Sequence, residues 1–513
     1  MFEPQEREPW YRSQVLKVGA VAVVAVVGLA VLYQLVGYRL FRGDEAKYSE
    51  LERHREQQRR QAASAPADPN AAPAAAPAAD PNAAAGNANQ PPGAAASPQA
   101  QPDSAAPGGQ SVPQGGEASH AAAPAPAASR NYWTNFRGPA RDGNYAERAV
   151  KVNWPAGGLK PMWKQPVGGG YASFVVADGV AFTLEQRRRQ EVATAYQLDT
   201  GRELWAHAWD AEYKDSTGDG PRSTPTWDDG RLYALGALGE LRCLDARTGK
   251  LVWNKNILRD NGAENLQWAT AASPLVVDDK VIVVPGGPAG KSVVAYHKLT
   301  GAALWKVQND PAAYASPSLV TLAGRRQVLV VTGSRLMGLA PEDGALLWSH
   351  PWSVSYGVGA SQPLVVGKNR VFITAGYGKG AALVEVAGAG KGYAARTVWE
   401  NTSLKTQFNS PVIHNGHAYG LDGEILTCVD VATGERKWKG GRYGRGQLLA
   451  ASGHLIITTE TGEIALVKAD PAGFAEVARF PALEGQTWNV PAIAAGRLLV
   501  RNAGQMACYD LSL

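Results

Sequence analysis

The sequence predicts an all-β fold, an eight-bladed β-propeller of four-stranded antiparallel blades. The first observation is a glycine followed four residues later by a tryptophan. This pair recurs at a spacing of about 40 to 50 residues, which is typical of propeller blades. The second is a repeated proline-led strand, and the third is a count of eight such units. The Gly and Trp pairs are Gly201 and Trp205, Gly249 and Trp253, Gly301 and Trp305, Gly344 and Trp348, and Gly434 and Trp438.

Each pair ends a longer motif that is clearest in residues 243–253 (Cys-Leu-Asp-Ala-Arg-Thr-Gly-Lys-Leu-Val-Trp) and 428–438 (Cys-Val-Asp-Val-Ala-Thr-Gly-Glu-Arg-Lys-Trp). The Asp side chain can cap a turn, and the Gly supplies a positive φ that closes a hairpin. A tryptophan at a fixed place on the next strand offers a large apolar surface, so we expect it to pack between blades. The expected structural docking tryptophans are Trp163, Trp205, Trp253, Trp305, Trp348 and Trp438.

A proline opens a strand upstream of most motifs, and a short turn follows. These prolines are Pro225, Pro274, Pro317, Pro363, Pro411 and Pro491. Proline suits the first residue of a strand because it donates no ladder hydrogen bond. The units start at Ser173, Thr224, Ser273, Ser316, Gln362, Ser410, Gln447 and Val490. The last unit is one strand short, and residues 159–165 around Trp163 can supply that strand and close the ring.

The residues before the propeller have a different composition. We predict an N-terminal tail (1–14), a transmembrane helix (15–38), a charged juxtamembrane segment (39–61), a disordered Ala/Pro-rich linker (62–129) and the propeller (130–513). Residues 18–38 contain Gln34 as their only strongly polar side chain, and their helical length is about 30 Å. A cleaved signal peptide is the alternative, although no small-residue cleavage site follows closely. The linker would reach roughly 45 Å as a coil and about 200 Å when extended.

The charges near the apolar segment favour a cytoplasmic propeller. Three Lys or Arg residues precede the segment, and seven follow it within residues 39–60. The positive-inside rule places the richer side in the cytoplasm, but large domains translocate largely regardless of flanking charge. The net charge of +5 over 513 residues gives no indication of nucleic-acid binding.

The cysteines and histidines predict neither a disulfide nor a metal site. Cys243, Cys428 and Cys508 occupy one motif position in separate blades, so we expect small core residues too far apart to bridge. His414 and His417 flank a turn and could offer two imidazoles to zinc. A third ligand is missing nearby, and the alternative is two surface histidines.

One set of equivalent positions suggests a binding site. Three residues before the proline position, the eight units carry Tyr171, Arg222, Ala271, Tyr314, Ala360, Phe408, Arg445 and Trp488. If the proline strand is innermost, this register places one side chain per blade at the same rim of the central channel. Aromatic residues and Arg are enriched where proteins bind partners. We therefore expect Tyr171, Arg222, Tyr314, Phe408, Arg445 and Trp488 to bind a partner; the alternative is that they pack between blades.

The motif Asp-x-x-Thr-Gly-x-x-x-Trp resembles the tryptophan-docking motif of pyrroloquinoline quinone (PQQ) type propellers. Residues 136–143, 220–225, 272–277, 408–411 and 488–491 share this likeness, which extends from about residue 131 to the end. The chain is similar to PQQ-binding-like β-propeller repeat proteins, the BamB-like and quinoprotein-type family. This resemblance implies an exported, envelope-facing protein. We therefore expect a single-pass protein of the bacterial inner membrane, with its propeller in the periplasm.

The resemblance also implies an enzymatic alternative, because quinoprotein alcohol dehydrogenases use eight such blades. Those enzymes hold PQQ in the channel with calcium, an Asp base and a disulfide between adjacent cysteines. This sequence has no adjacent cysteines and no acidic cluster assignable to calcium. We expect no cofactor and no catalytic residue. The predicted function is a membrane-anchored, non-catalytic scaffold that binds proteins or ligands in the cell envelope. A PQQ-dependent quinoprotein dehydrogenase and a carbohydrate or small-ligand sensor are the alternatives.

Overall fold

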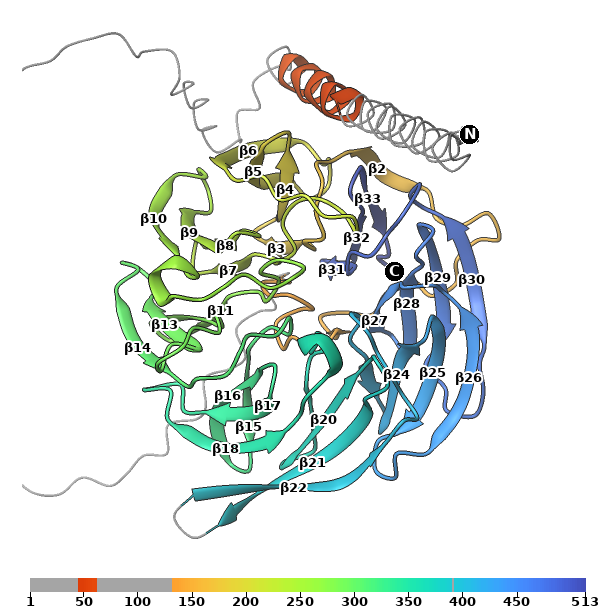
Figure 1. The fold of residues 1–513 in the computed structure, drawn as a ribbon. Helices are drawn as coiled ribbons and strands as arrows, with labels where there is room; N and C mark the ends of the chain where they lie inside the picture. The colour runs from red at the N-terminus through yellow and green to blue at the C-terminus, as the bar shows by residue number, and fades with distance from the viewer. Residues whose placement is uncertain (1–44, 62–131, 390–391) are drawn as a thin grey trace, which may run out of the picture. The chain divides into compact units, whose positions relative to one another are not determined.

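A computed structural model describes residues 45–61, 132–389 and 392–513. In these ranges the strands form eight sheets arranged around a central axis (Figure 1). Each blade contains four antiparallel strands, and one blade carries a fifth, parallel strand. The predicted eight-bladed propeller is confirmed.

The first four blades follow one another along the chain. The first contains β3 (Val175–Ala177), β4 (Val180–Arg187), β5 (Gln190–Gln197) and β6 (Glu203–Asp210). The second contains β7 (Thr226–Asp228), β8 (Arg231–Leu235), β9 (Glu240–Asp245) and β10 (Leu251–Asn256), followed by the 3-10 turn η1 (Arg259–Asn261). The third contains β11 (Leu275–Val277), β12 (Lys280–Val283), β13 (Val293–His297) and β14 (Ala303–Val307). The fourth contains β15 (Ser318–Leu322), β16 (Arg325–Val331), β17 (Arg335–Leu339) and β18 (Leu346–Pro351).

The other four blades complete the ring. The 3-10 turn η2 (Ser355–Gly357) leads to the fifth, which contains β19 (Leu364–Val366), β20 (Arg370–Ala375), β21 (Gly380–Ala389) and β22 (Gly392–Asn401). The sixth contains β23 (Val412–His414), β24 (His417–Asp422), β25 (Ile425–Asp430) and β26 (Arg436–Arg442). The seventh contains β27 (Gln447–Ala451), β28 (His454–Thr458), β29 (Glu463–Lys468) and β30 (Glu476–Pro481). The eighth contains β31 (Ala492–Ala494), β32 (Arg497–Arg501), β33 (Gln505–Asp510) and β2 (Pro161–Pro166).

The ring closes as the sequence predicts. Strand β2 pairs antiparallel with β33, and Trp163 lies opposite Cys508. An N-terminal strand therefore completes the blade formed by the C-terminus, and β33 is paired on both sides. The six repeated prolines lie one residue before their innermost strands rather than inside them. Strand β1 (Asn144–Tyr145), which the sequence did not predict, adds to β27 in parallel.

Four of the six motif tryptophans donate one hydrogen bond to a backbone oxygen of the next blade. The indole Nε1 of Trp205 donates to Ala246 O at 3.0 Å, and its ring packs on Gly249 of the second blade. A Cβ at Gly249, whose φ is +71°, would lie 2.6 Å from that ring. Glycine at this position therefore allows both the positive φ of the turn and the close approach of the Trp205 indole. Equivalent bonds run from Trp163 to Leu198 O, from Trp253 to Lys298 O and from Trp438 to Asp470 O.

Two of the expected docking tryptophans depart from this pattern. Trp348 donates to Gln327 Oε1 within its own blade, because the next blade turns between β21 and β22 without the Thr-Gly motif. The Nε1 of Trp305 has no hydrogen-bond partner among the described residues, although its ring packs against Gly344. The fifth blade instead docks through Trp399, which donates to Val431 O at 3.0 Å and packs on Gly434. Trp253 and Trp348 are buried, whereas the other docking tryptophans are half-buried.

The three cysteines are free and fully buried in β9, β25 and β33. Burial raises their pKa values to about 11 for Cys243 and about 12 for Cys428 and Cys508, which keeps the thiols protonated. His414 and His417 face each other across the β23–β24 hairpin. Within the described ranges, no group of three or more His, Cys, Asp or Glu side chains could hold a metal ion.

The predicted tail (1–14), transmembrane helix (15–38) and linker (62–129) lie outside the described residues. Among the residues that are described, no helix is long and apolar enough to span a bilayer. Residues 45–61 of the charged segment are helical. We call them the docked helix, because their side chains contact the first and eighth blades.

Candidate functional site

The six predicted rim residues lie together around one pocket. It has a volume of about 340 Å³ and opens where the chain enters the innermost strands. All eight aligned positions line it, the two alanines included: Tyr171, Arg222, Ala271, Tyr314, Ala360, Phe408, Arg445 and Trp488. The repeat register explains this convergence, because equivalent residues of successive blades are related by the rotation around the ring. Whether these residues bind a partner stays a prediction.

The aromatic residues of the rim contact one another as well as the pocket. Tyr171 and Trp488 stack with ring centroids 5.6 Å apart, and the Phe408 ring lies 5.1 Å from the Trp488 ring. Tyr314 packs against Trp268, which also lines the pocket. All four predicted aromatic residues are half-buried. The aromatic contacts therefore form two groups, one of Tyr171, Trp488 and Phe408 and one of Tyr314 and Trp268.

The two arginines of the rim have different surroundings. Arg222 stacks on Tyr213 at 4.4 Å and on Tyr171 at 5.3 Å, and it donates to the backbone oxygens of Trp268, Gly218 and Gly220. Burial lowers its pKa. Arg445 lies over Trp488 at 5.7 Å and is exposed. Arg222 and Arg445 are the charged side chains among the described residues lining the pocket, and Glu460, outside this lining, accepts the Trp488 Nε1 hydrogen bond at 3.0 Å.

A buried amide oxygen in the pocket wall lacks a hydrogen-bond partner. Gln447 is only 2 % exposed, and its Nε2 donates to Phe408 O at 3.3 Å. Its Oε1 finds no donor among the described residues. Leaving such an acceptor unpaired costs about 1 to 3 kcal/mol, so a donor supplied by a ligand or by water would stabilise it. From the sequence we predicted Gln447 to start a repeat unit but did not predict that it lines the pocket.

Two tyrosines near the mouth have left-handed backbone conformations. Tyr377 lines the pocket with φ +55°, and Tyr356 has φ +60° and a side chain that is 81 % exposed. Their rings meet edge to face at 6.0 Å. A left-handed conformation costs a non-glycine residue roughly 1 kcal/mol or more, and such strain often marks binding sites. The sequence analysis missed both residues; the only local signal was a tyrosine beside glycine in Tyr356-Gly357 and Gly376-Tyr377.

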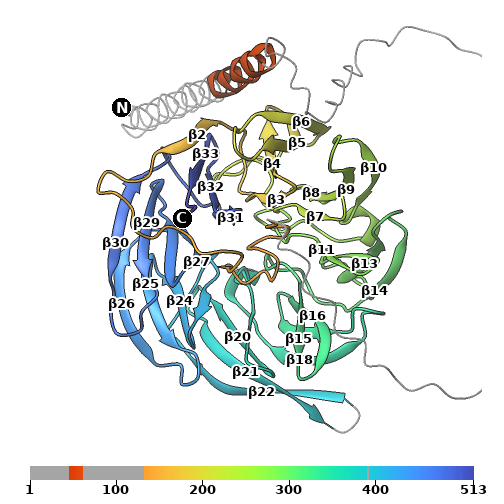
Figure 2. The same cartoon turned by 180° about the vertical axis from the view of Figure 1, so that it is seen from behind.

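A segment that precedes β1 fills the channel beneath the pocket. Residues 134–143, which we call the plug, cross the centre of the ring when it is seen from behind (Figure 2). Phe136 forms part of the pocket floor. Arg137 donates to Leu448 O and Pro411 O, and Arg141 donates to the backbone oxygens of Ser273, Pro274 and Pro317. The plug therefore reaches blades on both sides of the channel.

The plug arginines satisfy carbonyl groups at the entry to the innermost strands. An innermost strand is an edge strand, so its channel-facing carbonyls have no ladder partner. A guanidinium carries five donors and suits this task. Burial lowers the pKa of Arg137 to about 10 and that of Arg141 to about 9, so both remain cationic at neutral pH. A separate cavity of about 350 Å³ has the plug residues Ala140 and Asp142 and the β1 residue Asn144 in its wall.

The pocket does not fit a calcium-dependent quinone cofactor. Calcium takes six to eight oxygen ligands and usually several carboxylates. The described residues lining the pocket offer hydroxyl and amide oxygens from Thr217, Ser316, Gln407 and Gln447, but no carboxylate. A general base of the Asp type is likewise missing from this lining.

Comparisons with known proteins agree with this architecture. A family model described as "Outer membrane protein assembly factor BamB" matches residues 188–440. The structure of BamB from Moraxella catarrhalis is similar with a TM-score of 0.51 and 18 % identity, covering 69 % of this chain and 97 % of that chain. The chain is therefore similar to PQQ-like β-propeller proteins in sequence over residues 188–440 and shares their fold. Quinohemoprotein alcohol dehydrogenase from Comamonas testosteroni is similar with a TM-score of 0.56 and 15 % identity, covering 74 % of this chain and 81 % of that chain.

The sequence is also similar to those of quinoprotein ethanol dehydrogenases. The enzyme of Pseudomonas aeruginosa is 28 % identical over 159 residues, which are 28 % of this chain and 25 % of the relative. The enzyme of Pseudomonas putida is 25 % identical over the same shares of the two chains. The chain thus spans about a quarter of the length of these curated relatives. The two solved structures, at 18 % and 15 % identity, show the fold alone.

Proposed function

We propose that this PQQ-like propeller is a non-catalytic binding scaffold of the bacterial cell envelope and that the channel-mouth pocket is its binding site. One observation carries the proposal. Eight equivalent positions converge on one pocket, and six of them are aromatic or Arg. Such residues supply most of the binding energy in protein interfaces. The unpaired Gln447 Oε1 in the wall adds a place for a ligand donor.

The pocket chemistry favours a ligand with an apolar face and an anionic group. Its aromatic side chains offer flat apolar surface, and the exposed Arg445 offers a guanidinium that can bind a carboxylate in a bidentate manner. A volume of about 340 Å³ is at the lower end of ligand pockets and accommodates a few side chains or one sugar ring. A peptide segment of an envelope protein meets these requirements, and an acidic sugar is the second candidate.

Site-specific photo-crosslinking in native membranes tests the pocket. A photoreactive residue at Tyr377 lies in the pocket, whereas one at Phe474 lies near β26, away from the pocket residues. The two side chains have nearly equal exposure, 37 % and 38 %, so they form a matched pair. We expect a discrete adduct from position 377 and none from position 474. Adducts from both positions, or from 474 only, would contradict the pocket as the binding site.

The absence of carboxylates from the described pocket lining supports a non-catalytic role. The quinoprotein alternative is tested by titrating the purified protein with PQQ in the presence of calcium. We expect no saturable change in absorbance or melting temperature and no dye-linked alcohol oxidation. A saturable shift accompanied by turnover would establish the enzyme instead.

We place the propeller in the periplasm, anchored to the inner membrane by residues 15–38. The apolarity of residues 18–38 and the match to a BamB family model support this placement. Reporters that are active only in an oxidising or only in a reducing compartment, fused after Leu513, test it. Activity of the cytoplasmic reporter would refute both this placement and the envelope role.

A further inference from the structure

The docked helix contacts the seam where the propeller ring closes. Its inward face carries Leu51, His54, Arg55 and Gln58, which have the spacing of one helical face. Leu51 and Arg55 are 2 % and 3 % exposed, whereas Glu52, Arg53, Glu56 and Arg59 are exposed. Burial of one face along a charged helix indicates specific docking.

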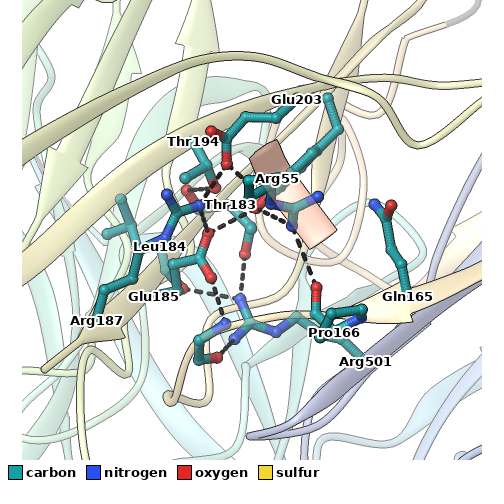
Figure 3. Close-up of polar contacts among 12 residues, drawn as sticks. Arg55, Gln165, Pro166, Thr183, Leu184, Glu185, Arg187, Thr194, Glu203 and Arg501 are labelled. Carbon is teal, nitrogen blue, oxygen red and sulfur yellow. Dashed lines mark hydrogen bonds and ion pairs between the residues drawn. The ribbon is translucent and has the colours of Figure 1, made fainter. Parts of the chain in front are cut away.

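Arg55 links the two blades that meet at this seam (Figure 3). Its Nη2 donates to Pro166 O of β2 at 3.1 Å and to the Tyr196 hydroxyl of β5 at 3.2 Å. Its Nε pairs with Glu203 Oε2 of β6 at 3.2 Å, and its guanidinium lies 4.8 Å from the centre of the Tyr196 ring. β2 belongs to the eighth blade, and β5 and β6 belong to the first. One buried side chain therefore spans the closure.

Four neighbouring contacts accompany this link. Gln58 Nε2 donates to Gln165 Oε1 of β2 at 2.9 Å, and Gln58 Oε1 accepts the Glu203 amide at 3.4 Å. At the turn between β4 and β5, Arg188 pairs with Glu45 at 2.8 Å and with Glu52. The Arg188 pairs are exposed and contribute little free energy, so Arg55 and Leu51 carry the specificity.

The propeller remains electrostatically satisfied without the helix. Glu203 also pairs with Arg187 at 2.5 Å, and the Tyr196 hydroxyl donates to Glu185 at 2.6 Å. Burial alone would raise the pKa of Glu185, but Arg187, Arg55 and Arg501 together lower it to about 2. Two of these three cations belong to the propeller. Departure of the helix would leave no buried carboxylate unpaired, so the docking is separable from folding.

We propose that the docked helix is an intramolecular latch that binds the seam between the first and eighth blades and holds the upstream chain at that edge of the propeller. Residues 61 and 132, the described residues on either side of the predicted linker, then both belong to the latched propeller. Only residues 39–44 separate the helix from the apolar segment 18–38, and six residues reach at most about 20 Å. The seam edge consequently lies next to the bilayer; this last step rests on the proposed membrane anchoring.

Hydrogen exchange of the full chain tests the latch without reference to membranes. We expect amides within residues 47–60 to be protected at least 100-fold over an unfolded chain in the wild type. Arg55→Glu should abolish this protection, whereas Arg59→Glu, which makes the same charge change on the exposed face, should retain it. Leu51→Asp is a second disrupting variant. An unprotected wild-type helix, or equal protection in all four proteins, would overturn the latch. Protection that rises with protein concentration would overturn it in favour of docking on a second copy.

Energy transfer from the propeller to acceptor lipids tests the orientation separately. Lys160→Cys places a donor dye beside β2, and Glu342→Cys places it in the fourth blade, while the three natural cysteines are buried. In vesicles of phosphatidylethanolamine and phosphatidylglycerol, we expect at least twofold stronger quenching at position 160 than at 342. Arg55→Glu should remove the difference. Equal quenching in the latched protein would overturn the orientation. Failure to float with the vesicles would instead refute the membrane anchor, and the exchange result would still decide the latch.

Discussion

Glu191 should make the stability of the propeller fall as the pH rises. This residue is fully buried in β5 at the joint between the first and second blades. Its Oε1 accepts the Ala237 amide at 2.8 Å, and its Oε2 accepts Trp209 Nε1 at 3.2 Å. Burial raises its pKa from 4.5 to about 7, because the two hydrogen bonds and the nearby Arg222 only partly offset the lost hydration.

The sign and size of the effect follow from proton linkage. The folded protein holds this proton more tightly than the unfolded chain, so the stabilisation is fully present below pH 4.5 and disappears as the pH rises through 7. At about 1.4 kcal/mol per pKa unit, the shift corresponds to a loss of roughly 3 kcal/mol. Most of this loss falls between pH 5 and pH 8.

Urea unfolding of the wild type and Glu191→Gln at pH 5 and pH 8 measures this loss. Glutamine stays neutral, so the variant should lack this part of the pH dependence. We expect the wild type to lose about 2 to 3 kcal/mol more than the variant over this range. Glu342→Gln, on the exposed surface, should behave like the wild type. Parallel pH profiles for the wild type and Glu191→Gln would refute the assignment of a protonated buried carboxyl.

Three further predictions concern ring closure and the plug. Trp163→Ala should lower the free energy of unfolding by about 2 to 3 kcal/mol, because it removes the indole and its hydrogen bond to Leu198 O. This cost is smaller than that of a fully buried tryptophan because the Trp163 indole is half-buried. An unchanged urea midpoint would contradict this prediction. A chain starting at Tyr132 should fold, whereas one starting at Tyr171, which lacks the plug and β2, should aggregate or melt lower; equal melting temperatures would show that the ring closes otherwise. Arg141→Met should lower the free energy of unfolding by at least about 2 kcal/mol, because it removes the donors to the backbone oxygens of Ser273, Pro274 and Pro317. The control Arg148→Met, at a partly exposed position, should change it by less than about 0.5 kcal/mol. Equal effects of the two substitutions would contradict the role of the plug.

The sequence predicts the propeller well because the same motif residues recur in successive units. The Thr-Gly turns and the proline entries each specify one unit, and the count of units requires the closing strand around Trp163. The rim positions were predictable for the same reason, since one register applies to every blade. Trp399 escaped prediction because its own blade lacks the motif turn, although its indole still reaches Gly434 of the next blade.

The remaining features depend on contacts between distant parts of the chain. The roles of Arg137 and Arg141 appear only when the innermost strands bring their free carbonyl groups to the channel. The unpaired oxygen of Gln447 and the left-handed backbone of Tyr377 are properties of the assembled pocket. Docking of residues 45–61 likewise depends on Tyr196 and Glu203, more than a hundred residues away. Composition alone indicated a charged, solvated segment there.

The central claim is that the channel-mouth pocket binds a partner. The most direct measurement combines the yield of the position-377 adduct in the triple variant Tyr314→Ala, Phe408→Ala and Trp488→Ala with the melting temperatures of the three single variants. These side chains are half-buried, so each single substitution should cost less stability than Trp253→Ala, whereas losing interface anchors worth 2 kcal/mol or more should reduce capture by at least about 30-fold. The account predicts this loss of capture, with each of the three single variants melting at a higher temperature than Trp253→Ala. Unchanged capture, or a single variant that melts as low as Trp253→Ala, would contradict it.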